Sequence, residues 1–173
     1  LTCQNSRNVC AQFRDEINSI FQKTGLLYSL NTDLQVERIV ENSPLTPEVE
    51  ATIATVKEPG TLELLKEAIL LHKSPYPTDI RDATEKIWDA FERLKTYYTT
   101  LNKRDSAAKI VNDMSGGQDD YITLFDTEFN ALTKIGNNFR IRHHETDKIE
   151  ITDIRYYDYF FNRCLSLIAL AIQ

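Results

Sequence analysis

Three long stretches with apolar residues at helical spacing constrain the fold of this chain more than any other feature. They run from Asp79 to Leu101, from Gln118 to Ile135 and from Thr152 to Ile172. In each stretch apolar side chains recur every three or four residues, which places them on one face of an α-helix. Because such helices must pack together to bury these faces, the sequence predicts an all-α, mainly helical bundle.

The first of these stretches has the clearest stripe. Trp88 flanks its apolar residues, which are Ile80, Ala83, Ile87, Phe91, Leu94, Tyr98 and Leu101. The last stretch is apolar on nearly all sides, but its run from Tyr159 to Ile172 contains Asn162 and Arg163 and is shorter than the roughly 20 residues of a membrane span. We expect this helix to be central in the domain or to form part of a dimer interface, with no membrane contact.

Shorter elements precede and separate the long helices. Residues 6–23 have an amphipathic helical pattern, and residues 26–40 alternate around an Asn-Thr-Asp turn, which predicts a small β-hairpin. Two short helices, 44–56 and 61–72, come next. Residues 102–120 interrupt the regular pattern, so we expect a mobile connection there with at most one short helical turn.

Length and composition fit one domain. The chain has 173 residues, of which 42% are hydrophobic and 27% charged, so it is neither disordered nor membrane-embedded. We expect a single domain over 1–173, with the N-terminal helix, the hairpin and a short helix in 1–60 and the helical core in 61–173. The chain begins with Leu1 and its only methionine is Met114. We therefore expect that it lost its initiator or was cut from a longer protein.

Charge and cysteine content exclude several function classes. A net charge of -6 argues against a protein that coats nucleic acid with its whole surface, so any RNA contact must use a local basic patch. Cys3, Cys10 and Cys164 are odd in number and irregularly spaced, which disfavours a disulfide framework and a zinc site and fits a reducing cytoplasm. The sequence has no Gly-rich phosphate loop and no His-Glu-x-x-His motif, so we expect no cofactor and no metal.

The segment from Asn137 to Glu145 is the best candidate for a functional site. It contains Arg140, Arg142, His143 and His144 within nine residues. We expect it to follow a helix that ends at Gly136 and to lie in a loop between packed helices, where a ligand can reach its side chains. The adjacent histidines leave the backbone in different directions, which disfavours their sharing a metal.

The competing interpretation of this segment is structural. In it Arg140 and Arg142 pair with Glu145, Asp147 or Glu150, and one of the two histidines hydrogen-bonds the end of a helix. Such roles are common for charged loop residues.

Three segments carry a resemblance to a known family. They are Glu85-Lys86-Ile87-Trp88-Asp89-Ala90-Phe91-Glu92-Arg93-Leu94-Lys95-Thr96, the segment from Asn137 to Glu145, and Asp158-Tyr159-Phe160-Phe161-Asn162-Arg163-Cys164-Leu165-Ser166-Leu167-Ile168. With them the chain resembles, over about residues 26–173, bacterial abortive-infection proteins of the AbiJ and Abi C-terminal type, which look like members of the HEPN superfamily. The resemblance implies an all-α bundle, often dimeric, with a metal-independent RNase site. That site is an arginine–polar pair, typically Arg-Asn in these relatives, followed four to six residues later by a histidine.

Carried onto this chain, the second position of the motif matches Asn138, and the histidine falls on His144 or on His143. The arginine position falls on Asn137, which departs from the family pattern. Arginine matters there because its fixed positive fork neutralises phosphate charge, whereas asparagine offers only a neutral amide.

Under the enzymatic hypothesis, RNA is cleaved by transesterification without a metal. Histidine suits the proton transfer because both of its protonation states are available around neutrality. We expect His144 to act as acid or base, Arg142 or Arg140 to stabilise the phosphate, and Asn138 to orient it.

Three functions remain open from the sequence. The first is an RNase effector of bacterial anti-phage or toxin-antitoxin defence, acting on RNA as a homodimer, with an antitoxin or companion defence subunit as a further partner. The second is a non-catalytic HEPN-like module that binds RNA or nucleotide, or dimerises, in a larger defence protein, and Asn137 favours it. The third is a plain helical interaction domain, which the acidic charge favours.

Overall fold

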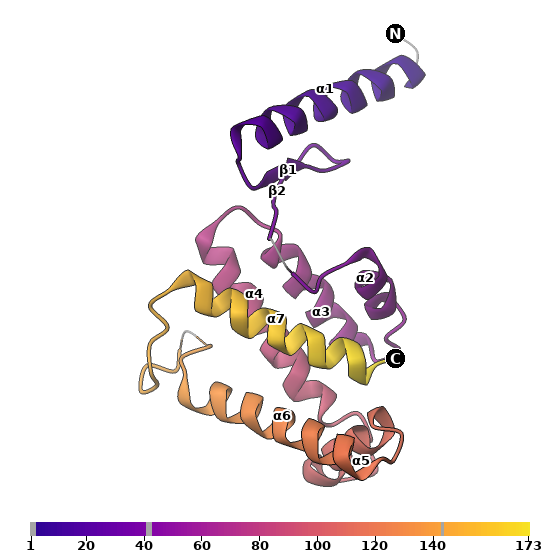
Figure 1. Cartoon of the computed structure of the whole chain (residues 1–173), viewed down its shortest axis with the longest axis vertical. Helices are drawn as coiled ribbons and strands as arrows, with labels where there is room; N and C mark the ends of the chain where they lie inside the picture. The colour runs from indigo at the N-terminus through magenta and orange to yellow at the C-terminus, as the bar shows by residue number, and fades with distance from the viewer. Residues whose placement is uncertain (1–2, 41–42, 143) are drawn as a thin grey trace.

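The computed structural model describes residues 3–40, 43–142 and 144–173. Over these residues the chain is mostly helical with one two-stranded antiparallel hairpin, which confirms the predicted fold class (Figure 1). In chain order the elements are α1 (Cys3–Thr24), β1 (Tyr28–Leu30), β2 (Val36–Arg38), α2 (Pro47–Ala54), α3 (Pro59–His72), α4 (Pro77–Leu94), α5 (Lys103–Met114), α6 (Asp119–Asn138) and α7 (Ile154–Ala171).

Helices α3, α4 and α7 form the centre of the molecule, because α4 packs against both of the others. The predicted apolar stripe of α4 is buried from Ile80 to Leu94. Phe91 of α4 and Phe161 of α7 are completely enclosed. Full burial of one such side chain contributes about 1.5 to 3 kcal/mol, so these helix contacts supply much of the driving force for folding.

Helices α2 to α7 make up the body of the molecule. Within it, α7 contacts α2 and α5 as well as α4. Asp153 caps its first turn by accepting a hydrogen bond from the backbone N–H of Arg155 at 2.9 Å. Its buried residues are Tyr157, Phe160, Phe161, Cys164, Leu165, Leu167, Ile168 and Ala169. Most of the apolar surface that made this helix a candidate interface is therefore used inside the chain. Among the described residues, no helix is long and apolar enough to cross a membrane.

Residues 3–40, which comprise α1 and the β1–β2 hairpin, form an arm that stands off one end of the body (Figure 1). The hairpin pairs Tyr28 with Arg38 and Leu30 with Val36. Helix α1 packs on β1, where the Asn18 amide donates to the carbonyl of Leu30 at 3.1 Å and accepts from its N–H at 2.6 Å. The side chain of Asn18 thus extends the hydrogen bonding of the hairpin to the helix.

The prediction for the segment after α4 was wrong in two respects. Helix α4 ends at Leu94 rather than at Leu101, and the expected mobile connection contains the helix α5. Asn102 starts α5 as an N-cap by accepting a hydrogen bond from the N–H of Asp105 at 3.0 Å. The inner face of this helix is formed by Ser106, Ile110 and Val111. A cap and a short buried stripe therefore order a segment whose irregular pattern had predicted mobility.

Gly136 was predicted to end the helix before the loop, and this was also wrong. It lies inside α6, which continues to Asn138. A Cβ atom at position 136 would lie 1.8 Å from Cζ2 of the buried Trp88. The glycine is therefore explained by the close approach of α6 to an indole ring rather than by a helix stop.

Candidate functional site

The loop of residues 139–149, which follows α6, is tied together at its two ends. The N–H of Arg140 donates to the carbonyl of Ile149 at 2.8 Å, and the N–H of Ile149 donates to the carbonyl of Asn138 at 3.0 Å. Phe139 and Ile149 thereby form a parallel bridge. The loop starts and returns at the same place, the end of α6.

Side chains anchor the same loop to the body. Ile141 is buried in the core with 1% of its surface exposed. Lys148 donates to the carbonyl of Gly136 at 3.0 Å and pairs with Glu145 at 2.9 Å. Because these contacts hold both halves of the loop, the exposed His144 and Thr146 are presented to solvent from an anchored segment.

Arg142 is held by two carboxylates. Its Nε and Nη2 donate to Oδ1 of Asp89 on α4 at 3.1 and 2.6 Å, and its Nη1 lies 3.7 Å from Oε1 of Glu145. Burial lowers the pKa of Arg142, but the hydrogen bond and charge of Asp89 outweigh it, and the pKa lies above its ordinary value. The guanidinium is therefore charged, and most of its charge is balanced within the protein. The contact with Glu145 matches the structural interpretation, whereas Asp89 was not anticipated.

The structure distributes the predicted site residues over a helix end and the loop. Asn137 and Asn138 are exposed in the last turn of α6, so they belong to the helix rather than to the loop. Arg140 is half-buried at the base of the loop, and His144 is exposed near its middle. His143 lies outside the described residues.

The loop brings Arg142 to Asp89, but it does not bring all of the predicted residues into mutual contact. In the described part of the chain, no side-chain hydrogen bond or ion pair joins His144 to Asn138 or to Arg142. A phosphate-bearing ligand that gathers them would meet a permanent cation, a titratable imidazole and an amide. The described residues contain no group of histidine, cysteine and carboxylate side chains arranged to hold a metal.

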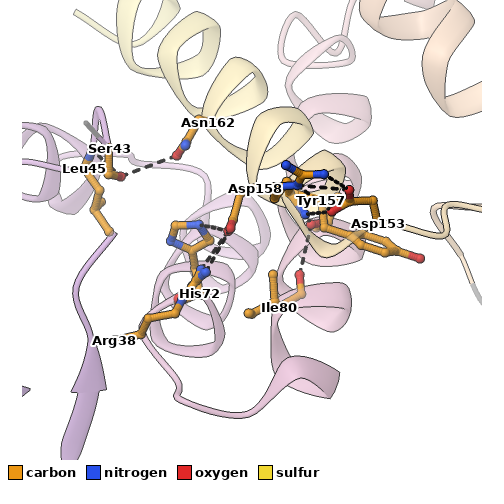
Figure 2. Close-up of polar contacts among 11 residues, drawn as sticks. Arg38, Ser43, Leu45, His72, Ile80, Asp153, Tyr157, Asp158 and Asn162 are labelled. Atoms are coloured by element: carbon orange, nitrogen blue, oxygen red, sulfur yellow. Dashed lines mark hydrogen bonds and ion pairs between the residues drawn. The ribbon is translucent and has the colours of Figure 1, made fainter. Parts of the chain in front are cut away.

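A second polar cluster lies where the arm meets the body, and it was not predicted. Arg38 of β2 donates to both carboxylate oxygens of Asp158 on α7, at 2.9 and 2.7 Å (Figure 2). The guanidinium also donates to the backbone carbonyl of His72 at 3.2 Å. The His72 ring, at the end of α3, stacks on Phe161 with ring centroids 3.7 Å apart and planes at 5°. The cluster therefore joins β2, α3 and α7.

Burial is the largest influence on the pKa of both titratable groups in this cluster. It lowers the pKa of His72, and the nearby Asp158 opposes this only in part. Burial raises the pKa of Asp158, but the contacts with His72 and Arg38 outweigh it and bring that pKa down to about 2. His72 Nε2 lies 3.3 Å from Asp158 Oδ1, yet it makes no well-aligned hydrogen bond with any described residue. Their contact is therefore mainly electrostatic, and the bidentate bond from Arg38 is the strong one.

The sequence contains a partial signal for this cluster. His72 continues the buried stripe of α3 that includes Leu65 and Ile69, and Asp158 stands in sequence between the buried Tyr157 and Phe160 of α7. A polar group in such a place needs a partner. That partner, Arg38, is 120 residues from Asp158 in sequence, so no local pattern identifies it. His72 is only 1% exposed, so a polymer substrate has no access to its ring, and the contacts of Arg38 connect the arm to the body.

Comparisons of this chain with protein-family models, with curated proteins and with solved structures found no match. The HEPN resemblance therefore rests on the three segments of sequence that carry it.

Proposed function

We propose that this chain is a HEPN-like effector of bacterial antiviral defence that cleaves RNA without a metal ion, at the 139–149 loop and the adjoining end of α6. The observation that carries the proposal is the construction of the loop. Its base is closed by a backbone bridge and anchored by the buried Ile141, and its exposed His144 follows two residues after the oriented Arg142. Groups that bind a ligand are commonly displayed in this way, on loops held by a packed scaffold.

The reaction is a transesterification within the RNA strand. A base removes the proton of a 2′-hydroxyl, the freed oxygen attacks the adjacent phosphorus, and the bond to the 5′-oxygen breaks as an acid protonates that oxygen. His144 takes one of the two proton-transfer roles, Arg142 stabilises negative charge on the phosphate, and Asn138 orients it. A second copy supplies the other proton-transfer group, in line with the dimers that the family resemblance implies.

A second candidate is a HEPN-like module that binds RNA or nucleotide without cutting it. Two observations favour it. Asn137 stands at the expected arginine position, and Arg142 already pairs with Asp89 and Glu145, which reduces the positive field that a phosphate meets. Binding then depends on the exposed edge of the guanidinium and on the amides at the end of α6.

Cleavage of a labelled RNA in the presence of EDTA tests the proposal. We expect the wild-type chain to cut the RNA and His144→Ala to lower the rate by about 100-fold or more, because removal of a proton-transfer group has costs of that order. RNA affinity should change by less than about threefold, since the permanent charge of Arg142 remains in the loop. Thr146→Ala, at an exposed position in the same loop, is the matched control and should leave both quantities unchanged.

The outcomes separate the candidates. Wild-type protein that binds RNA without cutting it would establish the binding module in place of the nuclease. Cleavage that persists in His144→Ala would move the chemistry away from this residue. If the wild-type chain neither binds nor cuts RNA at low salt, both RNA functions are refuted.

A further inference from the structure

The arm exposes large apolar side chains along its whole length. On α1, Val9, Phe13 and Ile20 are 63%, 50% and 53% exposed. The turn after α1 and the hairpin add Leu26, Leu27, Leu34, Val36 and Ile39, each at least 40% exposed. Leu30 is the one buried apolar residue of the arm among the side chains that the structure describes. The body differs, because α4 and α7 bury most of their apolar residues.

Specific contacts hold the arm in a defined position. Asn18 fixes α1 to β1 through two hydrogen bonds with Leu30, and the ring of Phe21 meets that of Tyr28 edge-on with centroids 6.4 Å apart. At the other end of the arm, Arg38 is bound to Asp158 and its N–H donates to the carbonyl of Lys73 at 2.7 Å. The exposed apolar side chains are therefore presented on a fixed support.

The exposed apolar area is close to what a stable interface needs. Together the eight exposed side chains leave several hundred Å² of apolar surface in water, which is more than isolated surface residues would give. Each partner in a standard protein–protein interface contributes about 800 Å². An amphipathic helix also owes most of its stability to the packing of its apolar face, and α1 receives cover mainly from the three-residue strand β1.

Charge permits another copy of this acidic chain to be the occupant. The whole chain carries a net charge of -6, so two copies repel each other over most of their surface. The arm has no net charge, because it contains four basic and four acidic residues: Arg7, Arg14, Lys23, Arg38, Asp15, Glu16, Asp33 and Glu37. Two copies can therefore approach through their arms without the repulsion that their bodies would meet.

We propose that the arm is a self-association surface, on which α1 and the hairpin of one copy pack against the arm of a second copy about a two-fold axis. An isologous contact of this kind places apolar side chain on apolar side chain and covers both arms at once. The proposal concerns residues 3–40 alone and does not require that the chain bind or cut RNA.

Sedimentation of the full chain tests this surface. The wild type should be dimeric at about 10 μM, and Phe13→Glu combined with Ile20→Glu should raise the dissociation constant by on the order of 100-fold, because four charges would enter an apolar interface. Leu124→Glu is the matched control: Leu124 is also 50% exposed, but it lies on α6 in the body. This variant should dimerise like the wild type.

A second variant controls for the case in which the two substitutions in α1 unfold that helix. Leu26→Glu combined with Leu27→Glu changes the exposed turn beyond α1 and should weaken the dimer in the same direction, while far-ultraviolet circular dichroism reports on helix content. A wild-type chain that stays monomeric to about 100 μM would overturn the proposal, as would dimers of both arm variants with wild-type affinity. Binding of the monomer to lipid vesicles would assign the apolar arm to a membrane surface instead.

Discussion

Two arginine–carboxylate pairs fasten remote segments of this chain to its central helices, one at the arm and one at the loop. In the pair at the arm, Arg38 and Asp158 are 17% and 21% exposed and use both carboxylate oxygens. In the pair at the loop, Arg142 and Asp89 are 30% and 33% exposed, and a single carboxylate oxygen accepts both hydrogen bonds. A histidine accompanies each pair, His72 in the core and the exposed His144 on the loop.

The two pairs contain the same residue types, so the extent of burial is what distinguishes the structural pair at the arm from the pair at the candidate site. Arg38 and Asp158 at the arm are mostly buried and pair with each other beside the His72 ring stacked on Phe161, so the charge of each is balanced by the other within the protein. At the loop, part of the guanidinium of Arg142 still faces solvent. The first pair should therefore determine stability, and the second should affect ligand binding more than stability.

The largest expected effect comes from breaking the pair at the arm. Asp158→Ala leaves Arg38 in a mostly buried position without its carboxylate, and we expect the free energy of unfolding to fall by about 3 kcal/mol. Urea denaturation measures this loss, and amide hydrogen exchange should show earlier opening of β1 and β2 than in the wild type.

The matching control replaces both members of that pair. Arg38→Met combined with Asp158→Leu removes both charges and keeps similar volume, so its stability should lie within about 1 kcal/mol of the wild type. A loss below about 1 kcal/mol in Asp158→Ala itself would contradict the role of this pair as the joint between arm and body.

The pH dependence of stability should also distinguish the two histidines. The pKa of His72 is lower in the folded chain, so the unfolded chain takes up a proton first and stability falls as the pH drops below about 6.5. The pKa of Asp158 is lowered to about 2, so its contribution is present above pH 4 and is lost between about pH 4 and pH 2. That second loss amounts to about 2 kcal/mol, because one pKa unit corresponds to about 1.4 kcal/mol.

Urea midpoints measured from pH 8 to pH 3 test these signs. His72→Phe keeps the stack on Phe161 and should flatten the decline below about pH 6.5, whereas His144→Ala, at an exposed position, should leave that decline in place. Equal slopes in His72→Phe and the wild type would show that the buried imidazole does not control stability.

The sequence predicted the fold where the pattern was long and regular. The hairpin and the stripe of α4 from Ile80 to Leu94 were placed correctly, because spacing alone identifies an apolar helix face and a strand turn. It failed at α5, where the N-cap Asn102 and a short buried face are too brief to stand out among charged neighbours. The prediction for Gly136 was wrong because the side chain of Trp88, on another helix, leaves no room for a Cβ atom at position 136. No local sequence pattern indicates that contact.

The candidate site was predictable only as a set of residue types. Arg142 and His144 were identified from their spacing, but the pairing of Arg142 with Asp89 joins positions 53 residues apart, and such pairs follow from tertiary packing. The buried cluster around His72 was missed for the same reason. Its signal was a polar residue in an apolar stripe, which indicates that a partner exists without saying which residue it is.

The smallest expected effect concerns the pair at the loop. A double-mutant cycle with Arg142→Ala and Asp89→Ala should give a coupling energy below about 1 kcal/mol, because the two side chains are partly exposed and water replaces much of what they lose. In the same variants, Arg142→Ala should weaken RNA binding and reduce its salt dependence by about one charge, whereas Asp89→Ala should strengthen binding by freeing the guanidinium. A coupling near 3 kcal/mol with RNA affinity unchanged in both variants would make this pair a second structural joint and would remove Arg142 from the proposed site.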